Sequence, residues 1–124
     1  MSSRLRMVVR VMGAGFTLQG IGWLVVPERS ATGLGMPLLN GLGRSTQIGD
    51  FAVFFLTLGV TMLAGTLVGR SRLLNFPAAL LAGAACSRMI AWAFHGAAFA
   101  TLFIAVEILG SILLFVTARH ADTW

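Results

Sequence analysis

The most restrictive feature of the sequence is a run of nineteen residues, 51–69, that contains no charged side chain. A helix of this length rises about 28 Å at roughly 1.5 Å per residue, enough to cross the roughly 30 Å hydrocarbon core of a bilayer. The whole chain of 124 residues is 57% hydrophobic and only 10% charged, with a mean hydropathy of +0.89. Soluble domains are much less apolar. We therefore predict an integral membrane protein.

Three further apolar runs predict three more membrane-spanning helices. The expected fold class is all-α, an antiparallel four-helix bundle in a single membrane domain, 1–124. The helices are expected at about 7–26, 50–69, 73–95 and 97–118, with an outer loop at 27–49. Residues 94–97 leave room only for a tight turn. The outer loop is too apolar for a solvated linker, and we expect it to form a short interfacial helix that acts as a lid.

The arginines outside the expected spans are divided unequally between the two sides of the membrane. One side holds Arg4, Arg6, Arg10, Arg70, Arg72 and Arg119, whereas the other holds only Arg29 and Arg44. The positive-inside rule then predicts that both termini face the cytoplasm and that the loop at 27–49 faces outward. In this arrangement the net charge of +5 serves topology and contacts with the lipid bilayer, and no nucleic acid is expected as a partner.

Small residues recur at four-residue spacing in the third expected helix. They form two rows, Ala79, Gly83 and Ser87, and Ala78, Ala82 and Cys86. Helices in lipid associate where small side chains let their backbones approach closely. The rows therefore predict close helix packing.

Two charged residues, Arg88 and Glu107, fall inside expected spans. A charged side chain at the centre of a membrane helix costs about 2.5–3.5 kcal/mol on insertion scales, so each needs a partner or a function. Counted from Gly96 at about 1.5 Å per residue, Arg88 lies roughly 10 Å and Glu107 roughly 15 Å below the outer boundary. The arginine stem can bridge this difference. We predict an ion pair between them, which either clamps the fold or belongs to a functional site.

Other polar side chains fall at related depths. Arg88, Trp92 and His95 share one face of a helix, and Asp50 and Thr57 share a face of another. Asp50 also suits the N-terminal cap of its helix. We predict a polar pocket in the outer half of the bundle, with Asp50 and His95 at its mouth and Glu107 at its floor. The expected ligand-binding residues are Gln19, Asp50, Thr57, Arg88, Trp92, His95 and Glu107.

Familiar catalytic and cofactor signatures are missing from the sequence. The two histidines lack metal-site spacing, Cys86 is the only cysteine, and no glycine-rich phosphate loop or serine elbow is present. No metal and no cofactor are therefore expected. Acid/base chemistry stays open, because Glu107, His95 and Asp50 could exchange protons with a hydrophobic substrate in a water-poor pocket.

Several features recur in a characteristic order along nearly the whole chain. They are the segment 23–27 (WLVVP), a glycine-rich loop, Gly49 and Asp50, the turn 70–72, Arg88 before Gly96, and Glu107 in the last helix. This order resembles a bacterial family of small four-helix membrane proteins known only as a domain of unknown function. The resemblance implies an architecture and a bacterial cytoplasmic membrane, and it carries no activity.

Three functions are compatible with these residues. The first is binding of a lipophilic or amphiphilic small molecule in the outward-opening pocket. The second is an isomerase, cyclase or hydratase that uses Glu107 or His95 on a hydrophobic substrate. The third is an accessory subunit or homo-oligomer that packs against other membrane helices through its small residues.

The arginine asymmetry predicts the topology directly. In a chain whose Cys86 is replaced, a cysteine introduced at Gly35 should react with a membrane-impermeant maleimide added from outside, because this loop is expected to face outward. A cysteine at Ser71 should stay unlabelled until the membrane is opened. The reverse labelling pattern would overturn the assignment.

Overall fold

The computed structural model describes residues 3–120, and these residues are almost entirely helical. The elements are α1 (Ser3–Val25), α2 (Pro27–Gly33), α3 (Gly41–Gly65), the 3-10 helix η1 (Ser71–Leu74), α4 (Asn75–Phe94) and α5 (Thr101–His120). Four helical stretches, α1, α3, η1 continuing into α4, and α5, are long and apolar enough to cross a membrane. The all-helical, multi-span character predicted from the sequence is confirmed.

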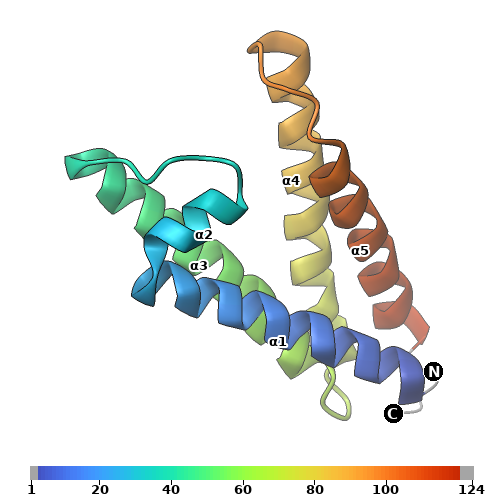
Figure 1. Cartoon of the computed structure of the whole chain (residues 1–124). Helices are drawn as coiled ribbons and strands as arrows, with labels where there is room; N and C mark the ends of the chain where they lie inside the picture. Colours follow the sequence, from blue (N-terminus) through green and yellow to red (C-terminus); the bar gives the residue numbers. More distant parts are fainter. Residues whose placement is uncertain (1–2, 121–124) are drawn as a thin grey trace.

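The helices lie in two pairs that meet at one end and diverge toward the other (Figure 1). We call α1 with α3 the first pair and α4 with α5 the second pair; η1 contacts α3, α4 and α5 where the pairs meet. At this joined end α1 begins and α5 finishes, whereas α2 and the residues between α4 and α5 lie toward the open end (Figure 1). The close packing that we expected of all four helices is found within each pair and at the joined end.

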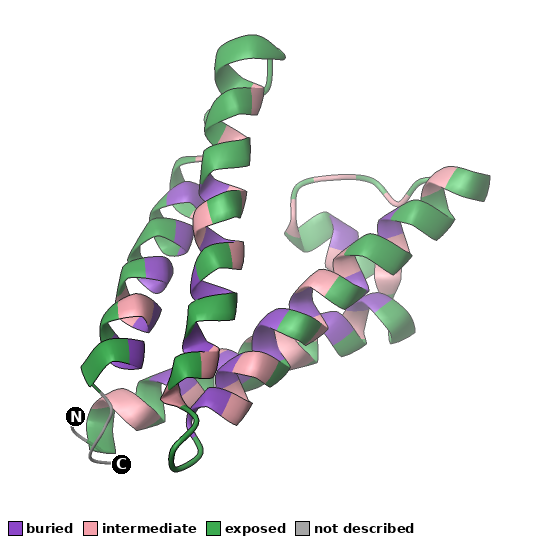
Figure 2. Cartoon of the chain, turned by 180° about the vertical axis from the view of Figure 1, so that it is seen from behind, coloured by how far each residue is buried: buried purple, intermediate pink, exposed green. Residues whose placement is uncertain are grey.

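Burial follows the two pairs. Buried residues lie where the helices of a pair face one another, and the outward sides are exposed (Figure 2). Those outward sides carry large aliphatic side chains, including Val11, Leu18, Val60 and Ile112. A protein whose four long helices all carry an apolar outer surface uses lipid as its solvent.

Glycine determines how closely α1 approaches α3. A Cβ atom added at Gly59 would lie 2.6 Å from the carbonyl oxygen of Gly13 and would also clash with Thr17, and one at Gly20 would lie 2.8 Å from the backbone nitrogen of Leu56. The two backbones are therefore in direct contact, which is how helices associate in lipid. Thr17 turns its hydroxyl inward and donates it to the Gly13 carbonyl at 2.8 Å.

The predicted packing rows of α4 are only partly buried. Ala79, Gly83 and Ser87 are exposed, and a Cβ at Gly83 would meet nothing within 4 Å. We assigned this row to packing from the spacing of its small residues. That spacing does not show which side of a helix faces a partner. In the second row, Ala78 is buried and its carbonyl accepts a 3.0 Å hydrogen bond from Ser111 of α5, whereas Cys86 is exposed.

The second spanning helix begins well before the predicted residue 50. Asn40 is extended (φ −113°, ψ 162°), Gly41 turns the chain with a left-handed φ of +54°, and the helix runs to Gly65. Asp50 is therefore an interior helical residue and does not cap the helix. The loop predicted at 27–49 was too long, because we took the first charge of the span as its boundary, whereas α3 continues beyond it.

The connection between α4 and α5 is also longer than the tight turn that we predicted. The end of α4 folds back on itself, with the backbone nitrogens of His95 and Ala97 both donating to the Ala91 carbonyl. Between these donors Gly96 adopts a left-handed φ of +68°, as is usual after a helix C-terminus. Helix α5 starts only at Thr101.

Buried Gln47, one of the residues we had placed in the outer loop, holds the segment after α2 against α3. Its Oε1 accepts the backbone N–H of Leu39 at 2.9 Å, and its Nε2 donates to the Pro37 carbonyl at 3.1 Å. Leu34, Met36 and Leu38 pack against the hydrophobic core beside it. A buried amide that satisfies two backbone groups makes this segment part of the fold.

Two arginines of α1 bind the last turn of α3 at the joined end. Arg6 Nε donates to the Thr66 carbonyl at 2.9 Å, and Arg10 Nε donates to the Thr66 hydroxyl at 3.1 Å. Positive charge at a helix C-terminus is favourable because the last carbonyls there are unpaired and carry partial negative charge. These contacts add polar attraction to the glycine-mediated packing of the first pair.

Alanine substitutions can distinguish a glycine that contacts another helix, such as Gly59, from an exposed glycine, such as Gly83. Gly59→Ala should lower the free energy of unfolding by about 1–3 kcal/mol, because the new methyl group must push α1 away from α3. Gly83→Ala is the matched control and should leave thermal melting in detergent unchanged. Equal melting temperatures for Gly59→Ala and the native chain would show that α1 and α3 are not in backbone contact.

Candidate functional site

A cavity of about 670 Å³ lies between the two pairs; we call it the central cavity. This volume is within the range of small-molecule sites. Four phenylalanines from the first pair form one wall, Phe16, Phe51, Phe54 and Phe55, and Leu34 follows α2 into it. The opposite wall comes from α4 and α5 and includes Leu81, Ala84, Leu102, Phe103 and Val106. The central cavity exists because the pairs diverge above their joined end.

The phenylalanine wall is held by contacts among aromatic rings. Phe16 stacks on Phe55 with a centroid distance of 6.2 Å, and Phe54 meets Phe55 edge-on at 5.2 Å. Phe51 stacks at 4.9 Å on Trp23, which is completely buried. Such ring pairs favour defined geometries over free rotation. The wall is therefore a fixed surface.

Arg88 and Glu107 form the predicted ion pair in the opposite wall. Arg88 Nε lies 2.8 Å from Glu107 Oε1, and the side chains are 37% and 10% exposed. The guanidinium carbon also lies 4.7 Å from the centre of the Phe103 ring, within range of a cation–π contact. Glu107 Oε1 is buried and accepts no well-directed hydrogen bond within residues 3–120. The contact is therefore ionic, and Oε1 keeps an unused capacity to accept a hydrogen bond.

Four of the seven predicted ligand-binding residues line the central cavity. Gln19 comes from α1, Asp50 from α3, Arg88 from α4 and Glu107 from α5. Each of the four long helices thus contributes one polar group, as we expected from their depths. The role of these groups in binding stays a prediction.

The other three predicted residues lie outside the cavity. Thr57 is exposed and does not line the cavity, although it follows Asp50 by two helical turns on nearly the same side of α3. Trp92 lies on the Arg88 side of α4 but about 6 Å further out, where the pairs have diverged, and it packs edge-on against Phe99 at 5.2 Å.

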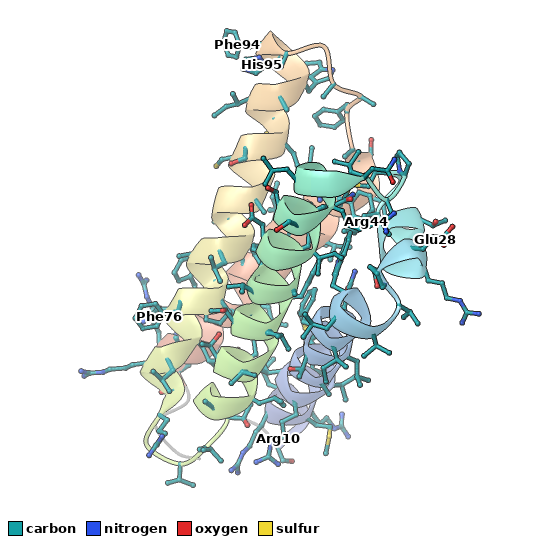
Figure 3. All side chains as sticks on the ribbon, turned by 90° about the vertical axis from the view of Figure 1, so that its left-hand side faces the viewer. Arg10, Glu28, Arg44, Phe76, Phe94 and His95 are labelled. Carbon is teal, nitrogen blue, oxygen red and sulfur yellow. The ribbon has the colours of Figure 1, made fainter. Side chains whose placement is uncertain are left out.

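His95 is exposed at the open end of α4, at the opposite end of the molecule from Arg10 (Figure 3). Glu107 contacts Arg88, which precedes His95 by seven residues or about 10 Å along α4, and His95 does not line the cavity. The predicted proton-exchanging set of Glu107, His95 and Asp50 is therefore not assembled. Within residues 3–120, no three His, Cys, Asp or Glu side chains are close enough to hold a metal ion.

The sequence interpretation missed the aromatic wall, although a signal for it was present. Phe51, Phe54, Phe55 and Leu58 follow the spacing of one helix face, the pattern of side chains that share an environment. In a span that is apolar all round, this pattern is hidden among equally apolar neighbours. Phe103 was missed as well, because its cation–π contact depends on Arg88, which lies on the neighbouring helix.

No protein-family model, no curated protein and no solved structure matches this chain. The resemblance to a small four-helix family therefore stays a prediction. Function has to be argued from the central cavity and its residues.

A double-mutant cycle tests the ion pair. Arg88→Gln and Glu107→Gln should each destabilise the fold by about 1–3 kcal/mol, less than the roughly 3–5 kcal/mol lost when a fully buried pair is broken. The loss is smaller because Arg88 is partly exposed and keeps its contact with Phe103, and because a lone carboxyl group can take up a proton. The double variant should lose less than the sum of the two singles. Strict additivity in detergent melting would mean that the two side chains do not interact.

Proposed function

We propose that this chain is a membrane protein that binds an amphiphilic small molecule in the central cavity. The observation that carries this proposal is the composition of the cavity: apolar walls from all four long helices, interrupted by one polar group from each. Ligand sites in proteins commonly combine a mostly apolar lining with a few convergent polar groups.

The medium explains why the polar groups matter more than the apolar walls. Lipid tails are as apolar as phenylalanine and leucine, so an apolar molecule gains little by leaving the bilayer for the cavity. A polar group at membrane depth gains much more, because it has no water to bind there. We infer that the apolar part of the ligand fits between the walls and that Gln19, Asp50, Arg88 and Glu107 recognise its polar end.

The proposal includes an orientation in the membrane. The start of α1, the segment around η1 and the end of α5 meet at the joined end, and they contain Arg4, Arg6, Arg10, Arg70, Arg72 and Arg119. The positive-inside rule favours the cytoplasmic side for such an end. Both termini would then be cytoplasmic and the central cavity would face the outer half of the membrane. The bacterial cytoplasmic membrane is the location that this arrangement fits.

Binding is favoured over acid/base catalysis by the pairing of Glu107. Its carboxylate lies 2.8 Å from the Arg88 guanidinium and is engaged in this contact within the cavity wall. With His95 outside the cavity, Asp50 is the remaining candidate for proton transfer among the predicted catalytic residues.

A subunit role is the second candidate, and the exposed row on α4 favours it. Ala79, Gly83 and Ser87 present small side chains on the outside of the second pair. Rows of this kind let membrane helices approach each other closely. A homo-oligomer or a complex with another membrane protein would use this row without involving the central cavity.

A filled cavity should release the ligand. Ala84→Phe places a ring in the central cavity, whereas Ala93→Phe adds the same ring to an exposed position of α4 that does not line it. Mass spectrometry of protein purified in mild detergent should find a defined amphiphile with the native chain and with Ala93→Phe, and about tenfold less with Ala84→Phe at unchanged melting temperature.

Two results would count against ligand binding. Equal amounts of the amphiphile in both variants would place it on the outer surface. A stoichiometric polypeptide in place of any small molecule would favour the subunit role.

A further inference from the structure

We propose that the amphiphile bound in the central cavity is a cation, a lipophilic amine or ammonium whose charged end lies between Asp50 and the phenyl rings of α3. This inference rests on the proposed binding function and specifies the chemical class of its ligand. It follows from the charges in the cavity wall and from the rings that surround them.

The ionisable residues that line the central cavity do not balance one another. Arg88 and Glu107 neutralise each other through their 2.8 Å contact, which leaves the charge of Asp50. Within residues 3–120, Asp50 has no ion pair and no side-chain hydrogen bond. The formal charge of the lining is therefore −1, from one arginine and two acids.

The nearest arginine along α3 is already engaged elsewhere. Arg44 Nε donates to the Leu39 carbonyl at 2.7 Å, and its terminal nitrogen donates to the Asn40 side chain at 3.3 Å. These contacts direct Arg44 toward the segment before α3, away from Asp50. Asp50 is exposed, so its carboxylate is accessible to a partner that residues 3–120 do not supply.

The charges of the cavity lining favour some classes of ligand head group over others. An anionic head would meet two carboxylates and a single guanidinium, which is already paired and covered on one side by Phe103. A neutral head would leave the Asp50 charge unmatched. A cationic head matches it, and the mostly apolar walls of the cavity strengthen the attraction.

The phenyl rings next to Asp50 favour the same class of ligand. Phe54 follows Asp50 by one helical turn on the same side of α3, and Phe51, Phe55 and Phe16 complete the wall. The face of an aromatic ring carries partial negative charge and attracts cations, ammonium groups in particular. One carboxylate in a lining rich in phenyl rings favours a positive charge and tolerates a bulky apolar body.

Arg88 has a positioning role in this site. It pairs with Glu107 at 2.8 Å and lies over the Phe103 ring, so that the unpaired acid of the cavity lining, Asp50, is on the α3 side. The ligand cation is therefore drawn to the phenylalanine wall.

Two probes of almost equal shape and opposite charge test the inference, tetraphenylphosphonium and tetraphenylborate. Their binding to the full chain is measured by equilibrium dialysis in a neutral detergent, after subtraction of uptake by protein-free micelles. The native chain should bind the phosphonium at least about tenfold more tightly than the borate, and Asp50→Asn should remove this preference. Glu28→Gln is the matched control, because Glu28 is an exposed acid of α2 outside the cavity lining, and it should keep the preference.

A second variant decides the matter if Asp50→Asn does not fold. Phe54→Leu keeps an apolar wall but removes a ring face, so it should weaken phosphonium binding several-fold and leave borate binding unchanged. Equal or tighter binding of the borate by the native chain, or an unchanged preference in Asp50→Asn, would overturn the inference.

The outcomes also separate this inference from the binding function. If the borate binds and Ala84→Phe abolishes its binding, the central cavity is a ligand site and the assignment of a cation is wrong. If the chain binds neither probe and Ala84→Phe has no effect on co-purified amphiphile, the proposed binding function fails together with the inference.

Discussion

Direct backbone contact between helices is the interaction on which the rest of this structure depends. In a bilayer, apolar side chains gain little by touching one another instead of lipid, so helices stay together mainly where small residues allow close approach. Gly59 against Gly13 and Thr17 provides such an approach between α1 and α3. The side of α3 that faces the second pair carries Phe54, Phe55 and Leu58 instead. These large residues allow no backbone contact, and the two pairs separate above η1.

The same distribution of residues, glycine between α1 and α3 and large side chains between the two pairs, explains the central cavity and the polar groups in it. Because large side chains line the gap between the pairs, space remains for a guest molecule. The polar groups in this gap lie among mostly apolar neighbours. Arg88 and Glu107 are tolerated there as a pair at 2.8 Å. Asp50 has no such partner and gives the site its chemical character.

Sequence reasoning succeeded where a physical requirement is absolute. An uncharged run such as 51–69 has few solutions other than a spanning helix, and residues 51–65 do lie in α3, although the helix ends at Gly65 and not at residue 69. Arg88 and Glu107 had to meet because neither is tolerated alone at that depth. It failed where the outcome depends on the direction of a helix face. Thr57 shares a side of α3 with Asp50 but does not line the cavity, and Trp92 lies beyond the cavity where the pairs have diverged, a property that no local pattern encodes. Gly83 has the same spacing as packing glycines but faces outward.

The joint at η1 has a mechanical consequence. Leu74 of η1 is fully buried against Gly65 at the end of α3, where a Cβ on the glycine would lie 2.6 Å from the leucine Cγ. Helix α4 extends about 30 Å from this joint, so a rotation of only 5° there would move its far end by about 2.6 Å. A small change in the packing of Leu74 against Gly65 would therefore change the width of the central cavity, although neither residue lines it.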